Sequence, residues 1–452
     1  MTVTARAPAP AGAGFARRLA ELAVRLTYRD IEVVSLGEAS HGPTVLVANH
    51  FGGLADALLL VHVSPRFPRI VARDVIWTYP LAGRLMRWIG AIPVHRRADV
   101  LGGRPDNDTM FSSCYQALRE GSLVLIFPEG VTQDDPHIAP VKTGAARIAI
   151  GARQSTGDDV ALQAAGLHYE DKAAFRSRVL VAFGDPLPTD TRAASLSSSD
   201  GDRGDRGAVR ALTEQVEQRL RQVAPDYHDW DEAADLQLAA QTTVRATSPW
   251  ADPVIDVPLA ASEPVASALG ALPAAATEDV RTAARAYRAS LAAARLTDAT
   301  LSLTMARPSP QRSRRLLDLA LIVLLAPYAA LGAVLGFVPY VAAQATRLLP
   351  VSPAVRATIL PVVALLAFLI EWMLVSAAAW SGLGWQTGAV TALLVPAFLG
   401  ATVVVAERAV LSWRALRRWS SLRGRSERVR RARVRRRELV ETSLAALLEV
   451  EP

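Results

Sequence analysis

Cysteine and lysine are almost absent from this chain of 452 residues. Cys114 is the only cysteine, which excludes a disulfide within the chain and favours a reducing compartment. Lys142 and Lys172 are the only lysines among 50 basic residues. Residues 1–22 lack an apolar core followed by a cleavage site, so we expect no secretory signal.

The excess of positive over negative charge is concentrated in one segment of the chain. The formal net charge is +7, yet residues 414–437 alone contain twelve arginines against one acid, Glu427. The rest of the chain is therefore net negative. No aromatic platform or zinc-ligand spacing accompanies the arginines, so we expect no nucleic acid as a partner. The arginine run follows an apolar block, which leaves two interpretations: a solvated helix face beside a membrane, or a site for anionic lipid headgroups.

Charge of either sign is missing from long stretches near the C-terminus. None occurs between Asp318 and Arg347, and Glu371 is the only charged residue between Arg356 and Glu407. Runs of this length exceed what a buried helix needs and match membrane-spanning segments. The sequence therefore predicts a multi-pass protein of the cell membrane, with membrane phospholipids among its partners.

The arginines that flank the apolar blocks predict how the chain crosses the membrane. Basic residues before the first block and the run after the last should both be cytoplasmic, which requires an even number of crossings. Pro327 and Pro339 interrupt the first block, and about 30 residues cannot cross the hydrocarbon twice. We therefore expect a shallow hairpin over 316–346 and two true spans, over 357–380 and 386–406.

Between the N-terminal helix and residue 187, short apolar runs alternate with helical patterns. This alternation predicts an α/β fold: a layered domain with a mostly parallel central sheet flanked by helices. A helical extension and transmembrane helices follow it. The expected organisation is an amphipathic helix (1–28), the layered catalytic domain (29–187), a flexible linker (188–207), the helical extension (208–310), a membrane domain (311–412) and a basic cytoplasmic tail (413–452).

One turn between an apolar strand and an apolar helix carries an imidazole and a carboxylate. The stretch VANHFGGLADALLL places His50 and Asp56 on either side of two glycines. Imidazole is suited to take a proton near neutral pH, and a carboxylate on its other ring nitrogen fixes the tautomer. The alternative is a surface-loop histidine beside an N-capping aspartate.

Other predicted strands also end in polar or charged residues. GAIPVHRR (90–97) ends in two arginines, LIFPEG (125–130) ends in Pro-Glu-Gly, and VKTGAA (141–146) places a lysine before a helix. Ligands of α/β sheets bind beyond the carboxyl ends of the strands, and basic groups near helix N-termini suit an anionic phosphate. The ordered set predicts a site for a phosphate-bearing ligand.

In this order, Asn49-His50 with Asp56, GAIPVHR and FPEG resemble blocks I to III of the glycerolipid acyltransferase superfamily. That superfamily includes glycerol-3-phosphate and 1-acylglycerol-3-phosphate (lysophosphatidate) acyltransferases. Most members separate the histidine and aspartate by four residues, whereas here there are five. The longer spacing resembles a subgroup typified by fungal glycerol-3-phosphate/dihydroxyacetone-phosphate acyltransferases and bacterial relatives.

The resemblance implies a role for each matching residue. His50 would be the general base on a glycerol hydroxyl, and Asp56 its orienting partner. Arg96 would bind the acceptor phosphate, and Glu129 and Gly130 would shape the pocket. The substrate-binding set is completed by Thr132 and Lys142.

The acyl donor would be acyl-CoA or an acyl-carrier protein, and the acceptor glycerol-3-phosphate or lysophosphatidate, with a cytoplasmic catalytic domain. No metal and no cofactor is implied. The sequence departs from the family pattern in VTQDD (131–135) and in Ala164-Ala165, where a proline is usual. Two alternatives stay open: an acyltransferase for another lysophospholipid or lipid alcohol, or a catalytically inactive membrane lipid-binding protein.

Overall fold

A computed structural model describes residues 9–37, 42–95, 107–157, 159–172, 174–188, 201–248, 256–303, 312–351, 353–423 and 427–449. The chain divides into two compact units. Unit 1 comprises Met1–Asp229 with Ser352–Thr358, and unit 2 comprises Trp230–Val351 with Ile359–Pro452. Each is described by itself.

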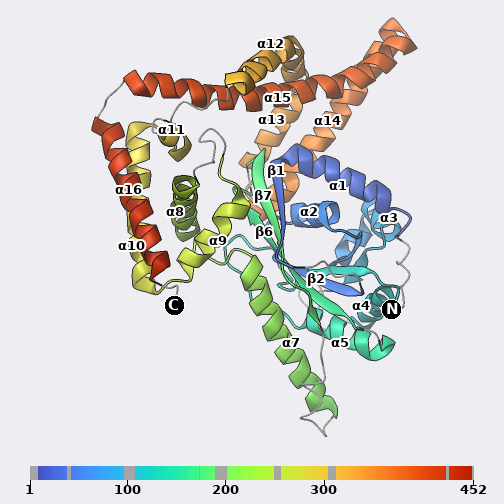
Figure 1. Ribbon diagram of the computed structural model, residues 1–452. Helices are drawn as coiled ribbons and strands as arrows, with labels where there is room; N and C mark the ends of the chain where they lie inside the picture. The colour runs from blue at the N-terminus through green and yellow to red at the C-terminus, as the bar shows by residue number, and fades with distance from the viewer. Residues whose placement is uncertain are drawn as a thin grey trace. The chain divides into compact units, whose positions relative to one another are not determined.

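Unit 1 is built on a mixed sheet that is mostly parallel (Figure 1). Its strands are β1 (Tyr28–Ser35), β2 (Thr44–Ala48), β3 (Pro68–Arg73), β4 (Ile92–Val94), β5 (Leu123–Ile126), β6 (Ala161–Tyr169), β7 (Ser177–Phe183) and β8 (Leu187–Pro188). The order is β1-β7-β6-β2-β5-β3-β4, and β8 pairs with β6. Only the β6–β7 and β6–β8 pairs are antiparallel. The predicted α/β class with a mostly parallel sheet is confirmed.

Helices cover both faces of this sheet. The helices of unit 1 are α1 (Ala13–Thr27), α2 (Leu54–Val63), η1 (Asp74–Thr78), α3 (Pro80–Trp88), α4 (Asp108–Arg119), α5 (Gly144–Thr156) and α7 (Gly201–Val223). Alternate residues of β2 point to opposite faces. Val45 and Val47 join a core with α4, α5 and α7, whereas Leu46 and Ala48 join a core with α1 and α2.

Helix α7 packs on the sheet of unit 1. It contacts β6, β2 and α5, and its buried residues Leu212, Val216 and Leu220 belong to the same core as α4 and α5. The expected helical extension (208–310) begins with this helix, so the structure places the change of unit after Asp229 instead. The helix also starts at Gly201, inside the linker expected at 188–207, of which residues 189–200 lie outside the described part.

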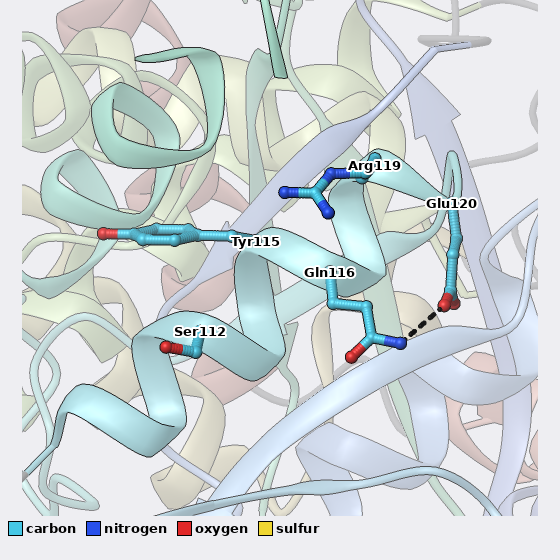
Figure 2. Close-up of a pocket in the computed structure, with 5 residues that line it drawn as sticks. All are labelled: Ser112, Tyr115, Gln116, Arg119 and Glu120. Carbon is cyan, nitrogen blue, oxygen red and sulfur yellow. Dashed lines mark hydrogen bonds between the residues drawn. The ribbon is translucent and has the colours of Figure 1, made fainter. Parts of the chain in front are cut away.

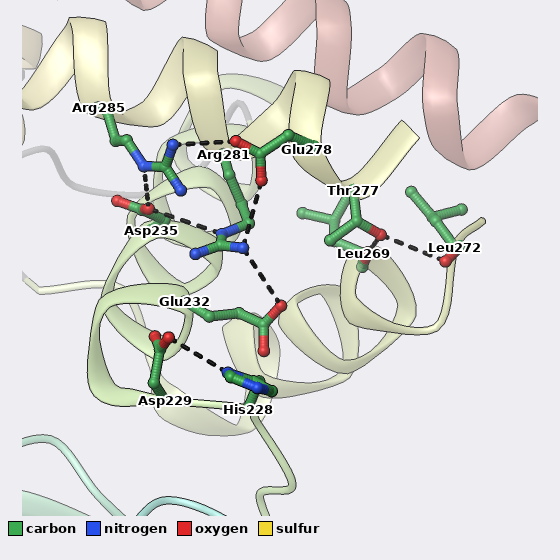
Figure 3. A network of polar contacts seen from close by, with 10 residues as sticks. All are labelled: His228, Asp229, Glu232, Asp235, Leu269, Leu272, Thr277, Glu278, Arg281 and Arg285. Carbon is green, nitrogen blue, oxygen red and sulfur yellow. Dashed lines mark hydrogen bonds and ion pairs between the residues drawn. The ribbon is translucent and has the colours of Figure 1, made fainter. Parts of the chain in front are cut away.

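Unit 2 begins as a bundle of helices. Its members are α8 (Trp230–Thr247), α9 (Leu259–Gly270), α10 (Ala274–Ala294), α11 (Asp298–Leu303) and α16 (Glu427–Leu448). Polar contacts join them: Asp235 of α8 is 3.0 Å from Nε of Arg285 and 3.8 Å from Nε of Arg281, both on α10 (Figure 3). Asp298 accepts hydrogen bonds from Tyr287 and Arg436.

The segment expected as a basic tail (413–452) is helical where the structure describes it. Helix α15 (Trp385–Arg423) includes residues 413–423, and α16 packs against α10, α8 and α9. The buried residues of α16 recur at helical spacing and face the bundle: Ala432, Leu439, Ser443 and Ala446. The helix contains more arginines than buried residues, so charge dominates its sequence although one face is packed against the bundle.

Among the residues that the structure describes, three helices are long and apolar enough to cross a membrane: Leu317–Leu335 in α12 (Arg312–Leu335), Val362–Leu383 in α14 (Pro353–Leu383) and Trp385–Val410 in α15. Helix α12 continues through Pro327, and the break falls at Gly336, before α13 (Phe337–Ala345) and η3 (Thr346–Leu348). The helix break therefore lies at Gly336 and not at Pro327, and the shallow hairpin over 316–346 stays a prediction.

Gly332 and Gly336 allow α12 to approach α15 closely. A Cβ on Gly332 would lie 2.1 Å from the carbonyl oxygen of Phe398, and one on Gly336 would lie 2.6 Å from Leu399. Thr402 donates a hydrogen bond to the Ala329 carbonyl (2.8 Å). Small residues four apart are typical of helix contacts within membranes. Because Gly336 lies against Leu399, α12 ends beside the middle of the candidate span of α15.

Candidate active site

The site begins where β2 ends. Asn49 is fully buried, and its side chain continues the pairing of β2 with β6: Nδ2 donates to the Leu167 carbonyl (3.1 Å), and Oδ1 accepts from the Leu167 N–H (2.7 Å). The Asn49 side chain thus makes two hydrogen bonds to Leu167 of the kind that neighbouring strands make through their backbones. The chain can then turn away from the sheet, which brings His50 to the carboxyl edge of the strands.

His50 and Asp56 form a hydrogen-bonded pair. Nδ1 of His50 lies 2.8 Å from Oδ2 of Asp56, whose side chain is fully buried, whereas the His50 side chain is 15% exposed. With the carboxylate accepting the Nδ1–H, Nε2 carries the lone pair and is free to take a proton. The alternative of a surface-loop histidine is not what the structure shows.

Two glycines hold the aspartate in place. The backbone N–H of Gly52 donates to both carboxylate oxygens, at 3.0 Å to Oδ1 and 2.9 Å to Oδ2. Gly53 has φ of +63°, a left-handed conformation that permits the turn into α2. Asp56 lies in the first turn of α2, where the free amides favour a negative charge. The loop therefore supplies donors that satisfy the buried carboxylate and fix its orientation.

Residues that follow β5 support the histidine from two sides. The ring of Phe127 stacks on the imidazole, with centroids 4.1 Å apart and planes 18° from parallel. Glu129 is buried, and its two oxygens accept the N–H groups of His50 (2.9 Å) and Ala139 (3.1 Å). Burial raises the pKa of Glu129, while these two N–H groups act in the opposite direction. Both residues fix the position of His50.

The segment after Glu129 folds around the same site. Gly130 has φ of +69°, and a Cβ there would lie 2.5 Å from Nζ of Lys142. The Gln133 N–H donates to the His50 carbonyl (2.8 Å). Gly130 and Lys142 are thus adjacent, and Thr132 lies between Gly130 and Gln133. The Lys142 side chain is exposed, which leaves its ammonium accessible to an anion.

Arg96 lies outside the described residues, so its role stays a prediction. The last described residue before it is His95, whose Nδ1 is 2.6 Å from Oδ2 of Asp74. This pair is exposed and follows β4, at the edge of the sheet. Strands β5 and β3 separate β4 from β2.

Two tyrosines at the site escaped the sequence analysis. Tyr169, the last residue of β6, donates a hydrogen bond to Oδ1 of Asp56, and the ring of Tyr28, the first residue of β1, packs against that of Tyr169. The sequence contains one signal, a polar aromatic side chain that closely follows the apolar run ending at Leu167. Only the strand order shows that β6 lies beside β2.

A separate hollow lies on α4, away from these residues. Figure 2 shows its lining: Ser112, Tyr115, Gln116, Arg119 and Glu120. Gln116 and Glu120 are hydrogen-bonded to each other (3.1 Å). Cys114, on the buried side of the same helix, has its pKa raised to about 12 by burial, so its thiol stays protonated at neutral pH.

Comparison with known proteins places this geometry in a family. Residues 25–163 match the family model described as Acyltransferase. Glycerol-3-phosphate O-acyltransferase 2 of Saccharomyces cerevisiae is 31% identical over 135 residues, which is 30% of this chain and 18% of that protein. A chloroplastic 1-acyl-sn-glycerol-3-phosphate acyltransferase of Brassica napus is 28% identical over 120 residues, 26% of this chain and 33% of that protein. The chain thus spans a third or less of the length of these relatives.

A solved structure is also similar. The 1-acyl-sn-glycerophosphate acyltransferase of Thermotoga maritima has a TM-score of 0.29 and 15% sequence identity, over 46% of this chain and 78% of that chain.

Unit 1 therefore contains an acyltransferase domain. The domain belongs to the glycerolipid acyltransferase superfamily, which confirms the resemblance seen in the sequence motifs.

Proposed function

We propose that the protein transfers a fatty acyl group from acyl-CoA or acyl-carrier protein to a hydroxyl of glycerol-3-phosphate or 1-acylglycerol-3-phosphate. The observation that carries this proposal is the His50–Asp56 pair, with Nδ1 bound to a buried carboxylate at 2.8 Å. It lies beyond the carboxyl ends of β2, β5 and β6, where ligands of α/β sheets bind.

The reaction follows from this geometry. Nε2 of His50 takes the proton of the acceptor hydroxyl as its oxygen attacks the thioester carbonyl. Asp56 stabilises the imidazolium that forms. When the tetrahedral intermediate collapses, the carbon–sulfur bond breaks and the imidazolium returns the proton to the leaving thiolate. The acyl group moves directly from sulfur to oxygen, so no acyl-enzyme forms.

We propose that two basic residues bind the acceptor phosphate. The exposed Lys142 lies beside Gly130, and Arg96 follows β4. A lysine ammonium and an arginine guanidinium both bind phosphate through charge-assisted hydrogen bonds. We propose that Glu129 shapes the pocket by accepting hydrogen bonds from the N–H groups of His50 and Ala139, and that Thr132 and Gly130 line the pocket. No metal or cofactor takes part in this proposal.

Helices α12, α14 and α15 associate the protein with a membrane, and we propose that unit 1 faces the cytoplasm of the cell membrane. Acyl-CoA and glycerol-3-phosphate are both available there, and a lipid product can leave sideways into the leaflet. Membrane phospholipids would surround the apolar faces of these helices.

The test is acyl transfer by the purified full-length protein in nanodiscs. Thiol release from palmitoyl-CoA is measured with glycerol-3-phosphate, lysophosphatidate, lysophosphatidylethanolamine or no acceptor, and the lipid product is identified by mass spectrometry. We expect release that depends on one of the first two acceptors. Release only with lysophosphatidylethanolamine would identify a lysophospholipid acyltransferase. Absence of release with every acceptor, also when palmitoyl-acyl-carrier protein is the donor, would refute the proposed activity.

A further inference from the structure

A second residue, besides Gly52, donates a hydrogen bond to the carboxylate of Asp56. Asp56 is fully buried, and its Oδ2 is taken by His50 and the Gly52 N–H. Its Oδ1 accepts from Gly52 and also from the hydroxyl of Tyr169. The tyrosine is therefore the only side chain besides His50 that hydrogen-bonds Asp56 among the residues that the structure describes.

Strand order explains why a tyrosine 113 positions away meets this aspartate. Strands β2 and β6 are parallel neighbours, with Ala48 opposite Ala165, so both run toward the same edge of the sheet. Strand β6 continues four residues past Ala165, as far as Tyr169. The side chain of Tyr169 thus lies next to the loop that follows β2.

A second tyrosine supports the first. The rings of Tyr28 and Tyr169 pack against each other, with centroids 5.9 Å apart, and the two hydroxyls interact electrostatically. Burial, followed by the negative charge of Asp56, raises the pKa of both groups above the ordinary value. Both hydroxyls therefore stay protonated at neutral pH, so that of Tyr169 remains a donor to Asp56.

We infer that Tyr169 is a positioning residue for the His50–Asp56 dyad, with Tyr28 behind it, and that it sets the pH range in which His50 acts as a base. This inference rests on the proposed function. Tyr169 does not touch His50 through any hydrogen bond that the structure shows, so it acts only through the carboxylate.

The physical effect has a definite sign. A hydrogen bond to a carboxylate draws charge away from its oxygens and fixes their orientation. Without the Tyr169 hydroxyl, Asp56 would attract the proton on Nδ1 more strongly and stabilise the imidazolium more. Because only neutral His50 accepts a proton, the acidic limb of the rate profile would move to higher pH.

The test is Tyr169→Phe, which keeps the ring and removes only the hydroxyl. A hydrogen bond to a charged group contributes about 1.5–3 kcal/mol, so we expect kcat to fall roughly 10- to 100-fold. The KM values for acyl-CoA and acceptor should stay within about twofold, and the acidic limb of kcat/KM should rise by about half a pH unit or more. Tyr28→Phe should shift the limb in the same direction by a smaller amount.

Tyr115→Phe on α4 is the matched control, because Tyr115 belongs to the same unit and lies at the hollow of Figure 2. It should leave kcat and the pH profile unchanged. An unshifted acidic limb in Tyr169→Phe would overturn the inference. If that variant failed to fold in a thermal melt, an unshifted limb in Tyr28→Phe would overturn it instead. His50→Ala separates the two claims: an inactive His50→Ala beside a normal Tyr169→Phe refutes only the role of Tyr169, whereas an active His50→Ala refutes the proposed mechanism.

Discussion

Gly52 offers a sharp test of how the dyad is held, because alanine at this position adds a single carbon. A Cβ on Gly52 would lie 2.7 Å from the Tyr169 hydroxyl oxygen and 2.8 Å from Oδ1 of Asp56. Both distances are shorter than a carbon atom tolerates, and both neighbours are held by hydrogen bonds rather than at the free end of a flexible chain. The carboxylate, the tyrosine or the loop must therefore move.

The expected cost follows from the bonds at risk. Gly52 donates to both oxygens of Asp56, and Tyr169 donates to one. Loss of one such bond to a charged group costs about 1.5–3 kcal/mol, which corresponds to roughly a 10- to 150-fold decrease in kcat. The assay is the initial rate of thiol release from acyl-CoA at saturating acceptor, with a thermal melt to confirm folding.

Gly14→Ala in α1 is the matched control, since a Cβ there meets nothing within 4 Å. It should keep the wild-type kcat and stabilise the helix by about 0.5–1 kcal/mol. A folded Gly52→Ala variant with wild-type kcat would show that the geometry around Asp56 does not govern the reaction.

Three further predictions concern stability and topology. Asp298→Ala removes the carboxylate that the largely buried Arg245 and Arg436 share. It should lower the free energy of unfolding of unit 2 in urea by about 3–5 kcal/mol, whereas Glu441→Ala, at an exposed ion pair, should lower it by less than about 1 kcal/mol. Equal losses would contradict the buried cluster. Burial alone would raise the pKa of Glu170, but Arg178 and Arg29 lower it below the ordinary value, so its stabilisation is present above about pH 4.3 and lost as the pH falls further. Glu170→Gln should therefore lose less stability than wild type between about pH 5 and pH 3, and equal slopes would contradict this. In a Cys114→Ser background, a membrane-impermeant thiol reagent added to intact cells should label Leu383→Cys and not Leu348→Cys; the reverse pattern would overturn the predicted orientation.

The packing of α16 gives the topological prediction a structural basis. Arg436 of α16 bonds Asp298 of α11, so the chain returns after the apolar helices to the bundle from which it entered them. We therefore expect both ends of the membrane block on one side of the membrane, with an even number of crossings. Helix α12, which ends beside the middle of α15, is the one that we expect not to cross.

The layered domain was largely predictable from sequence because its signals are local. Strands β1 to β7 each coincide with a short apolar run of the sequence, and such runs can be recognised locally. His50 and Asp56 were found because the two residues share one turn. The amphipathic helix expected within residues 1–28 is present as α1, Ala13–Thr27.

What the sequence could not show depends on which segments meet. Tyr169 contacts Asp56 only because β6 lies beside β2, and no local pattern gives that order. Helix α7 packs on the sheet although a polar segment precedes it, so composition misplaced the boundary. In α16 the buried residues alternate with many arginines, so the sequence pattern did not indicate a packed face. That Arg436 pairs with Asp298 inside the bundle follows only from the three-dimensional structure.

The most direct test of the central claim is the rate of acyl transfer by His50→Ala. His228→Ala is the matched control, because His228 also pairs with a carboxylate, Asp229, at 3.3 Å but is 88% exposed and apart from the dyad. With the proton acceptor gone, turnover should fall by at least about 10²–10⁴-fold in His50→Ala, while the thermal melt stays that of a folded protein and His228→Ala keeps wild-type activity. A folded His50→Ala variant that retained most of its acyl transfer would contradict the account.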